Sequence, residues 1–318
     1  MEDFPLYSID DVAEHTAIQF GYLYILGRNP ENVSVIESGA SAGLTIKQTR
    51  EALLACSEYR GKRLIESLAI NFKTQLDELP LRAEQGHATD EVIVLQTSDA
   101  SRYFEMLTIG VKHHEQWARA RGLDYRAFVG IKRGAYPHHA TYNRTHLLWE
   151  LVQARFQGWV LYLDADVLIT SLDFDLKGHL DALRRQGKCM LLHTVYDNTS
   201  PNYNWWDINA GAFAIDLSNA TARLIIQLWS HIYREMVSDD DYKRATQWED
   251  IINDQTSLSA ILQLIANQLK DTEAFQLCQF QHEWATQVLR SFPTGISSTE
   301  ELVQRTERLR ELSNKIIS

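Results

Sequence analysis

The strongest constraint on the fold is a short apolar run, residues 158–169, that is interrupted by two carboxylates. Five apolar residues lead directly into Asp164, Ala165 and Asp166, and three more apolar residues follow. A membrane-spanning helix needs about 20 apolar residues, so this run is too short to cross a bilayer. Its length and composition are typical of a strand that is buried on both faces, as in parallel sheets.

Two carboxylates so close together need a compensating charge. An unpaired charge in an apolar strand is costly, and neighbouring carboxylates also repel each other. Asp164 and Asp166 would lie on the same side of an extended chain, where both could face one divalent ion. Oxygen ligands suit Mg²⁺ and Mn²⁺, so we expect such an ion here. The alternative is a strand-end pair that accepts hydrogen bonds from backbone N–H groups.

Strands and helices alternate around this run. Further strands are predicted over residues 91–99, 124–130, 188–193 and 208–216, with amphipathic helices between the early strands. This alternation predicts an α/β fold with a mixed, mainly parallel sheet flanked by helices. Ligands bind beyond the carboxyl ends of parallel strands. We therefore expect the polar residues at two strand ends to meet at one edge: Thr97, Ser98, Asp99, Asp164 and Asp166.

The chain divides into three predicted parts. Residues 1–86 form a helical N-terminal unit, residues 87–293 the α/β domain, and residues 294–318 a C-terminal amphipathic helix. Segment 37–43 contains two glycines. It has no preceding strand and no Gly-Lys-Ser/Thr ending, so a plain turn is favoured over a phosphate-binding loop. The apolar positions of the C-terminal helix are Leu302, Leu309, Leu312 and Ile316.

Composition excludes some classes of function. The net charge of −11 argues against a broad nucleic-acid surface. The three cysteines are far apart in the sequence, which predicts free thiols in a reducing compartment. The N-terminus lacks the pattern of a secretion signal, and no apolar run is long enough for a transmembrane helix. We expect a cytoplasmic protein, with peripheral contact to a membrane left open.

Three motifs in this order resemble the nucleotide-sugar glycosyltransferases of the GT-A fold. They are Leu-Asp-Ala-Asp at 163–166, Asn-Ala-Gly-Ala-Phe at 209–213 and Asn-Asp-Gln-Thr-Ser-Leu at 253–258. Residues 90–285 are most similar to the metal-dependent group that includes galactosyl- and xylosyltransferases. The resemblance implies a Rossmann-like GT-A domain. It also implies transfer of a hexose or pentose from a nucleoside-diphosphate sugar, with a UDP-sugar favoured, to a saccharide or other hydroxyl acceptor.

The resemblance also implies a metal site. Asp164 and Asp166 match the Asp-x-Asp motif that holds Mn²⁺ or Mg²⁺ on the donor diphosphate, where the ion neutralises the charge of the leaving group. His282 is the candidate third ligand, and His193 is the fallback. The glycine and second aromatic that commonly follow this histidine in the family are absent here. A histidine in such an apolar-aromatic segment is equally compatible with a core position.

Further site residues are carried over from the resemblance. Asp254 and Gln255 match a catalytic pair near the anomeric carbon, where a carboxylate can act as base or stabilise an oxocarbenium-like centre. The alternative for Asp254 is a helix N-cap, and that for Arg144 is a surface arginine at a helix start. The predicted donor-binding residues are Thr97, Ser98 and Asp99 for the nucleoside, Arg144 for the phosphates, and Asn209, Ala210 and Gly211 for the sugar.

Two other functions stay open. The segment around Asp164 also resembles the first motif of haloacid-dehalogenase-type phosphatases, where the first Asp is the nucleophile and the second a general acid. That motif normally follows the first strand of its domain, whereas two strand–helix units precede it here. The other alternative is a non-catalytic protein that binds a nucleotide-sugar.

Overall fold

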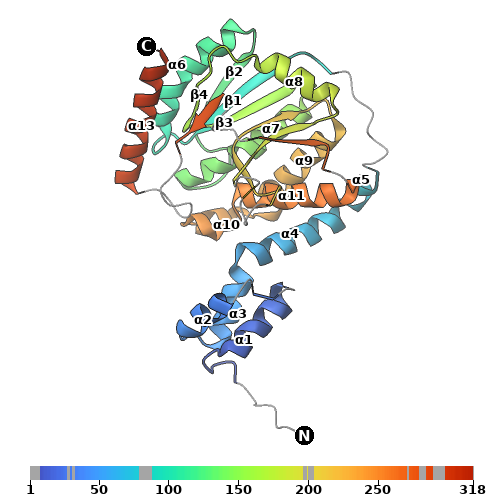
Figure 1. The fold of residues 1–318 in the computed structure, drawn as a ribbon, viewed down its shortest axis with the longest axis vertical. Coiled ribbons are helices and arrows are strands. Elements are labelled where there is room, and N and C mark those ends of the chain that lie inside the picture. The colour runs from blue at the N-terminus through green and yellow to red at the C-terminus, as the bar shows by residue number, and fades with distance from the viewer. Residues whose placement is uncertain are drawn as a thin grey trace. The chain divides into compact units, whose positions relative to one another are not determined.

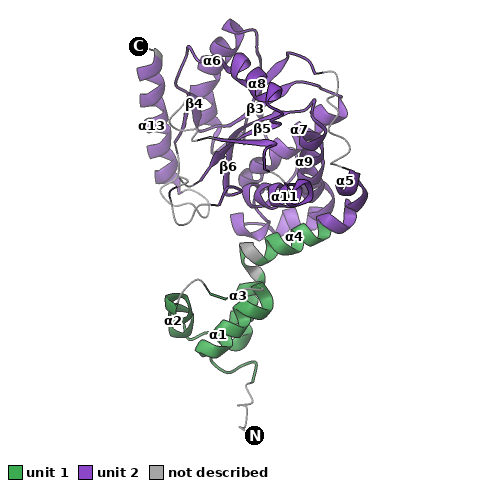
Figure 2. Ribbon diagram, turned by 45° about the vertical axis from the view of Figure 1, so that its right-hand side comes forward, with its two compact units in different colours: residues 1–67 green, residues 68–318 purple. Residues whose placement is uncertain are grey.

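The computed structural model describes residues 8–26, 29–30, 33–78, 88–195, 199, 204–270, 272–278, 284–288 and 298–317. The chain forms two compact units, residues 1–67 and residues 68–318 (Figure 2). Among the described residues, no helix is both long and apolar enough to span a membrane.

The first unit is helical. Thr45 caps α3 through a capping box, in which its hydroxyl accepts from Gln48 N and the Gln48 side chain accepts from Thr45 N. The expected turn at 37–43 was wrong, because the chain stays helical as far as Ser41. Gly39 lies close to Ile18 in this helix, because a Cβ at this position would be 3.1 Å from the Ile18 side chain. The helices are α1 (His15–Gly21), the π-helical η1 (Tyr22–Leu26), α2 (Val33–Ser41), α3 (Ile46–Ala55) and α4 (Ser57–Asn71), which continues into the second unit.

The second unit is built on a six-stranded sheet (Figure 1). Only β6 runs antiparallel to its neighbours, β3 and β5. The other pairings are parallel, so the predicted mixed, mainly parallel sheet is confirmed. In spatial order the strands are β2 (Asp124–Val129), β1 (Val92–Ser98), β3 (Trp159–Asp164), β6 (Ile208–Asp216), β5 (Met190–Thr194) and β7 (Phe275–Cys278).

Helices cover both faces of this sheet, as predicted (Figure 1). Along β3, Trp159, Leu161 and Leu163 pack in a buried cluster with α6 and α8, whereas Tyr162 stacks on Phe213 on the opposite face. The helices on the cluster side are α6 (Phe104–Ala120) and α8 (Leu176–Arg185). Those on the other side are α7 (Asn143–Gln153), α9 (Ala220–His231) and α11 (Asp254–Leu269). Shorter helices are α5 (Lys73–Glu78), η3 (Pro137–Tyr142), η4 (Ile232–Met236), α10 (Asp239–Arg244) and η5 (Trp248–Asp250).

The apolar run 158–169 is not one strand, contrary to the expectation from sequence. A turn at Ala165 and Asp166 separates β3 from β4 (Val167–Ile169), which belongs to a second sheet with β8 (Ala285–Gln287). The last helix, α13 (Thr299–Ile317), packs against α6. Because the chain turns at Asp166, the two carboxylates do not share one side of an extended strand.

Candidate functional site

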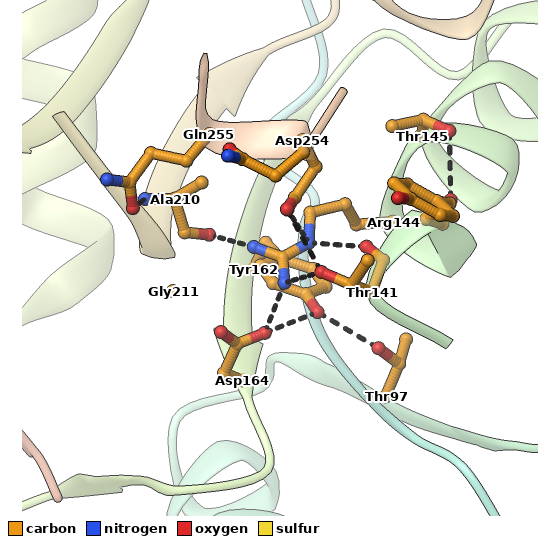
Figure 3. A network of polar contacts seen from close by, with 12 residues as sticks. Thr97, Thr141, Arg144, Thr145, Tyr162, Asp164, Ala210, Gly211, Asp254 and Gln255 are labelled. Carbon is orange, nitrogen blue, oxygen red and sulfur yellow. Dashed lines mark hydrogen bonds and ion pairs between the residues drawn. The ribbon is translucent and has the colours of Figure 1, made fainter. Parts of the chain in front are cut away.

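Three chain segments meet at the carboxyl edge of β3. Thr97 at the end of β1 is in register with Asp164 at the end of β3. The antiparallel β6 places Ala212 opposite Leu163, so its start lies beside the end of β3. From α11, Gln255 Oε1 accepts a hydrogen bond from Ala210 N at 3.3 Å. Predicted residues from distant parts of the sequence therefore gather at one place (Figure 3).

Arg144 is the centre of this cluster (Figure 3). Its side chain is 5% exposed; Nη2 donates to Asp164 Oδ1 at 2.7 Å, and Nε lies 3.0 Å from Asp254 Oδ2. Nη1 donates to the Ala210 carbonyl, and Nε to the Thr141 carbonyl at 3.0 Å. Burial lowers the pKa of Arg144, but the two carboxylates outweigh burial and raise it. The protein contacts of this guanidinium therefore involve all three of its nitrogens.

Asp164 is the more exposed of the two motif carboxylates, at 27%. Its Oδ1 also accepts a hydrogen bond from the Tyr162 hydroxyl at 2.8 Å. The Thr97 hydroxyl lies 2.9 Å from the Tyr162 hydroxyl oxygen and donates to it, because the Tyr162 proton is already used. Burial raises the pKa of Asp164, Arg144 opposes this, and the charges of Asp166 and Asp254 raise it further. The net direction is upward, so Asp164 takes up a proton more readily than an ordinary carboxylate.

Asp166 is bound on both oxygens. Its side chain is 9% exposed; Oδ1 accepts from Gln287 Nε2 at 3.0 Å, and Oδ2 accepts from Arg305 on α13. Gln287 is also tied to the start of β6, because its Oε1 accepts from Asn209 Nδ2 at 2.7 Å. Gly211 makes this arrangement possible, since a Cβ there would lie 2.4 Å from Gln287 Nε2.

Asp254 contacts Arg144 and is 3% exposed. Its Oδ1 accepts from the Thr141 hydroxyl at 3.0 Å. The helix cap is the preceding residue, Asn253, whose side chain accepts from Thr256 N at 2.7 Å. Asp254 therefore serves the arginine cluster and not the N-cap that was the alternative.

The loop after β1 is held by its own side chains. Asp99 is 1% exposed, and its oxygens accept from the backbone N–H groups of Ser101, Arg102 and Tyr103. The Ser98 hydroxyl donates to the Asp99 carbonyl at 2.7 Å. These contacts order the loop that leads into α6. The predicted contacts of Thr97, Ser98 and Asp99 with a nucleoside stay predictions.

A buried polar chain supports the site from the α6 face. Gln96 Nε2 donates to the backbone carbonyl of Asp164 at 2.9 Å. Its Oε1 accepts from the Tyr125 hydroxyl at 2.8 Å and lies 3.0 Å from His114 Nδ1. His114 Nε2 accepts from Ile169 N at 3.2 Å, so Nδ1 carries the proton and donates to Gln96. This chain fixes the backbone on both sides of the Asp-x-Asp turn.

The described carboxylates do not fit a divalent ion in this arrangement. Such ions take about six oxygen ligands. Asp166 already has a protein partner on each oxygen, and Asp164 has two on Oδ1. Within the described ranges, no group of three or more His, Cys, Asp or Glu could hold a metal. The predicted ligand His282 lies outside these ranges, and the backbone of the fallback His193 is in register with that of Asn209 on β6.

Sequence reasoning missed four residues of this site: Thr141, Tyr162, Gln287 and Arg305. Arg305 did leave a signal, because it follows Leu302 by three positions and precedes Leu309 by four. That spacing puts a charge on the apolar face of the helix. Gln287 left none, since its role depends on the pairing of β8 with β4.

Comparisons with known proteins leave the family open. No family model matches the chain, and no curated protein matches it. Two solved structures are similar in part. A glycosyltransferase involved in glycosylation of the major capsid of PBCV-1 has a TM-score of 0.45 and 11% identity, covering 69% of this chain and 98% of that chain. A putative glucose-1-phosphate thymidylyltransferase from Bacillus anthracis, in complex with a sucrose, has a TM-score of 0.36 and 9% identity, covering 70% and 99%. Both scores are low, so the site is interpreted from its own residues.

Proposed function

We propose that this chain is a glycosyltransferase that moves a hexose or pentose from a nucleoside-diphosphate sugar, with UDP-sugars first, to the hydroxyl of a saccharide or glycoconjugate. One observation carries the proposal. The strand-end carboxylate Asp164, the small-residue start of β6 and the start of α11 gather around Arg144 at one sheet edge. Their order along the chain is the order that resembles the GT-A enzymes.

The proposed roles follow from exposure and contact. Transfer breaks the bond between the anomeric carbon and the diphosphate, and joins that carbon to an acceptor oxygen that loses its proton. Asp164 is the most exposed carboxylate of the cluster, at 27%. Asn209, which is half-buried at the start of β6, is the proposed contact for the sugar, and the adjacent Ala210 and Gly211 are buried. Asp254 and Gln255 keep the catalytic role that the resemblance implies. No step is derived through Mn²⁺ or Mg²⁺, because the described carboxylates do not fit such an ion in this arrangement.

The test is a screen of UDP-, GDP- and dTDP-sugars by thermal shift, with and without Mn²⁺, followed by release of nucleoside diphosphate. A true donor at 100 times its Kd stabilises the protein by about 2.7 kcal/mol. This stabilisation should survive in Asp173→Asn, an exposed control, and be lost in Asp164→Asn.

Three outcomes would contradict the proposal. If no sugar nucleotide stabilises the protein, the proposed glycosyltransferase function is refuted. Release of phosphate from sugar phosphates, dependent on Asp164, would favour the phosphatase alternative. Stabilisation with no turnover in the presence of saccharide acceptors would favour a non-catalytic binding protein.

A further inference from the structure

Arg305 is buried on the apolar face of α13. The flanking Leu302 and Leu309 belong to a buried cluster with Met106 and Leu168. Residues three and four apart share a helix face, so Arg305 is directed into the same interior and is 6% exposed. A guanidinium in this position needs partners inside the fold.

Its partners come from three separate segments. Nε donates to the Val288 carbonyl at 3.0 Å, and Nη2 donates to Asp166 Oδ2. The guanidinium also lies 5.7 Å from the centre of the Tyr103 ring, in the loop that Asp99 holds. The arginine is therefore fixed by the 284–288 segment, the Asp-x-Asp turn and the loop after β1.

We propose that Arg305 is the resident cation of the Asp-x-Asp motif, so that Asp166 does not take a divalent ion. Gln287 and Arg305 together use both oxygens of Asp166. An ion at Asp166 would have to displace the guanidinium and leave a buried positive charge unpaired, which is strongly unfavourable. The C-terminal helix is then part of the site. This inference is independent of the substrate, and its test uses no sugar nucleotide.

The test is a titration of the full chain with Mn²⁺ alone, followed by electron paramagnetic resonance of the free ion. The variants are Asp166→Asn, Arg305→Gln, the double variant that combines them, and Arg308→Gln, which makes the same change at an exposed position of α13. Wild type and Arg308→Gln should bind no Mn²⁺ at Asp166, so Asp166→Asn should bind as much Mn²⁺ as wild type. Arg305→Gln should bind Mn²⁺ at least roughly tenfold tighter, because a unit charge close to the site is removed. The double variant should lose this gain.

Two results would overturn the proposal. One is a stoichiometric Mn²⁺ site in the wild type that Asp166→Asn abolishes. The other is a folded Arg305→Gln, checked by circular dichroism, that binds Mn²⁺ no better than wild type. If Arg305→Gln does not fold, the titrations of wild type and Asp166→Asn decide alone. Equal Mn²⁺ binding by wild type and Asp166→Asn supports a resident arginine. Loss of Mn²⁺ binding in Asp166→Asn refutes it.

Discussion

Lowering the pH should destabilise residues 68–318 through His114. This side chain is fully buried on α6, with Nε2 accepting from the Ile169 N–H and Nδ1 donating to Gln96. A second proton would have to sit on Nε2 and face the Ile169 N–H. The folded state therefore holds His114 in its neutral form.

The size of the effect follows from the pKa. Burial, and then the nearby His113, lowers the pKa of His114 from 6.5 to about 3. The unfolded chain takes up a proton below its ordinary pKa while the folded chain does not. Stability that is present above pH 6.5 is therefore lost as the pH falls from there towards 3. At about 1.4 kcal/mol per pKa unit, His114 alone should lower the free energy of unfolding by about 2 kcal/mol at pH 5.

The assay is urea unfolding at pH 7 and pH 5, followed by tryptophan fluorescence. All eight tryptophans lie in residues 68–318, so the signal reports on this unit. Burial also lowers the pKa of His139 and His146 to about 4, so only the difference between variants isolates His114. Between pH 7 and pH 5, the free energy of unfolding of His114→Gln should fall by about 2 kcal/mol less than that of wild type. The same change at half-buried His179 is the control. Equal losses in wild type and His114→Gln would refute the reasoning.

Three further substitutions test the arginine cluster by urea unfolding at pH 7. Arg144→Met should destabilise by about 3–5 kcal/mol, because it leaves buried carboxylates unpaired. Arg119→Met, exposed on α6, should change stability by less than about 0.5 kcal/mol. Thr141→Val removes a hydroxyl donor to one of those carboxylates and should cost about 1–3 kcal/mol. Gly211→Ala should cost about 1–3 kcal/mol, since the new methyl displaces Gln287. Wild-type stability in any of the three cluster variants would show that its contact does not matter.

The main sheet could be predicted because its strands are local patterns. Predicted strands 91–99, 124–130 and 208–216 correspond to β1, β2 and β6 with ends shifted by no more than one residue. Strands β1 and β6 are rich in apolar residues, and β2, which carries Asp124 and Arg126, lies between Gly122 and Gly130. The break after β3 could not be predicted in this way. Strand β4 has three residues, and its partner β8 lies more than 110 positions later.

The sequence predicted which residues of the site lie together but not the hydrogen bonds and ion pairs between them. Strand order alone brings Thr97, Asp164 and the start of β6 together. The sequence suggested that Arg144 meets a ligand, whereas the structure gives each of its nitrogens a protein partner. Such partners depend on side-chain positions at the ends of α7 and α11. Residue spacing carries no information about those positions.

A buried Asp-x-Asp motif requires a positive charge but does not say which one. The sequence offers 31 lysines and arginines, and it equally allows a metal ion. Arg305 differs from an ordinary surface arginine in one respect, because it interrupts a leucine stripe on a helix that must bury that stripe. Its partner Asp166 lies 139 positions earlier, so only the packing of α13 against α6 joins them. In this chain, the arginine on the apolar face of α13 and the second carboxylate of the motif are the two halves of one buried ion pair.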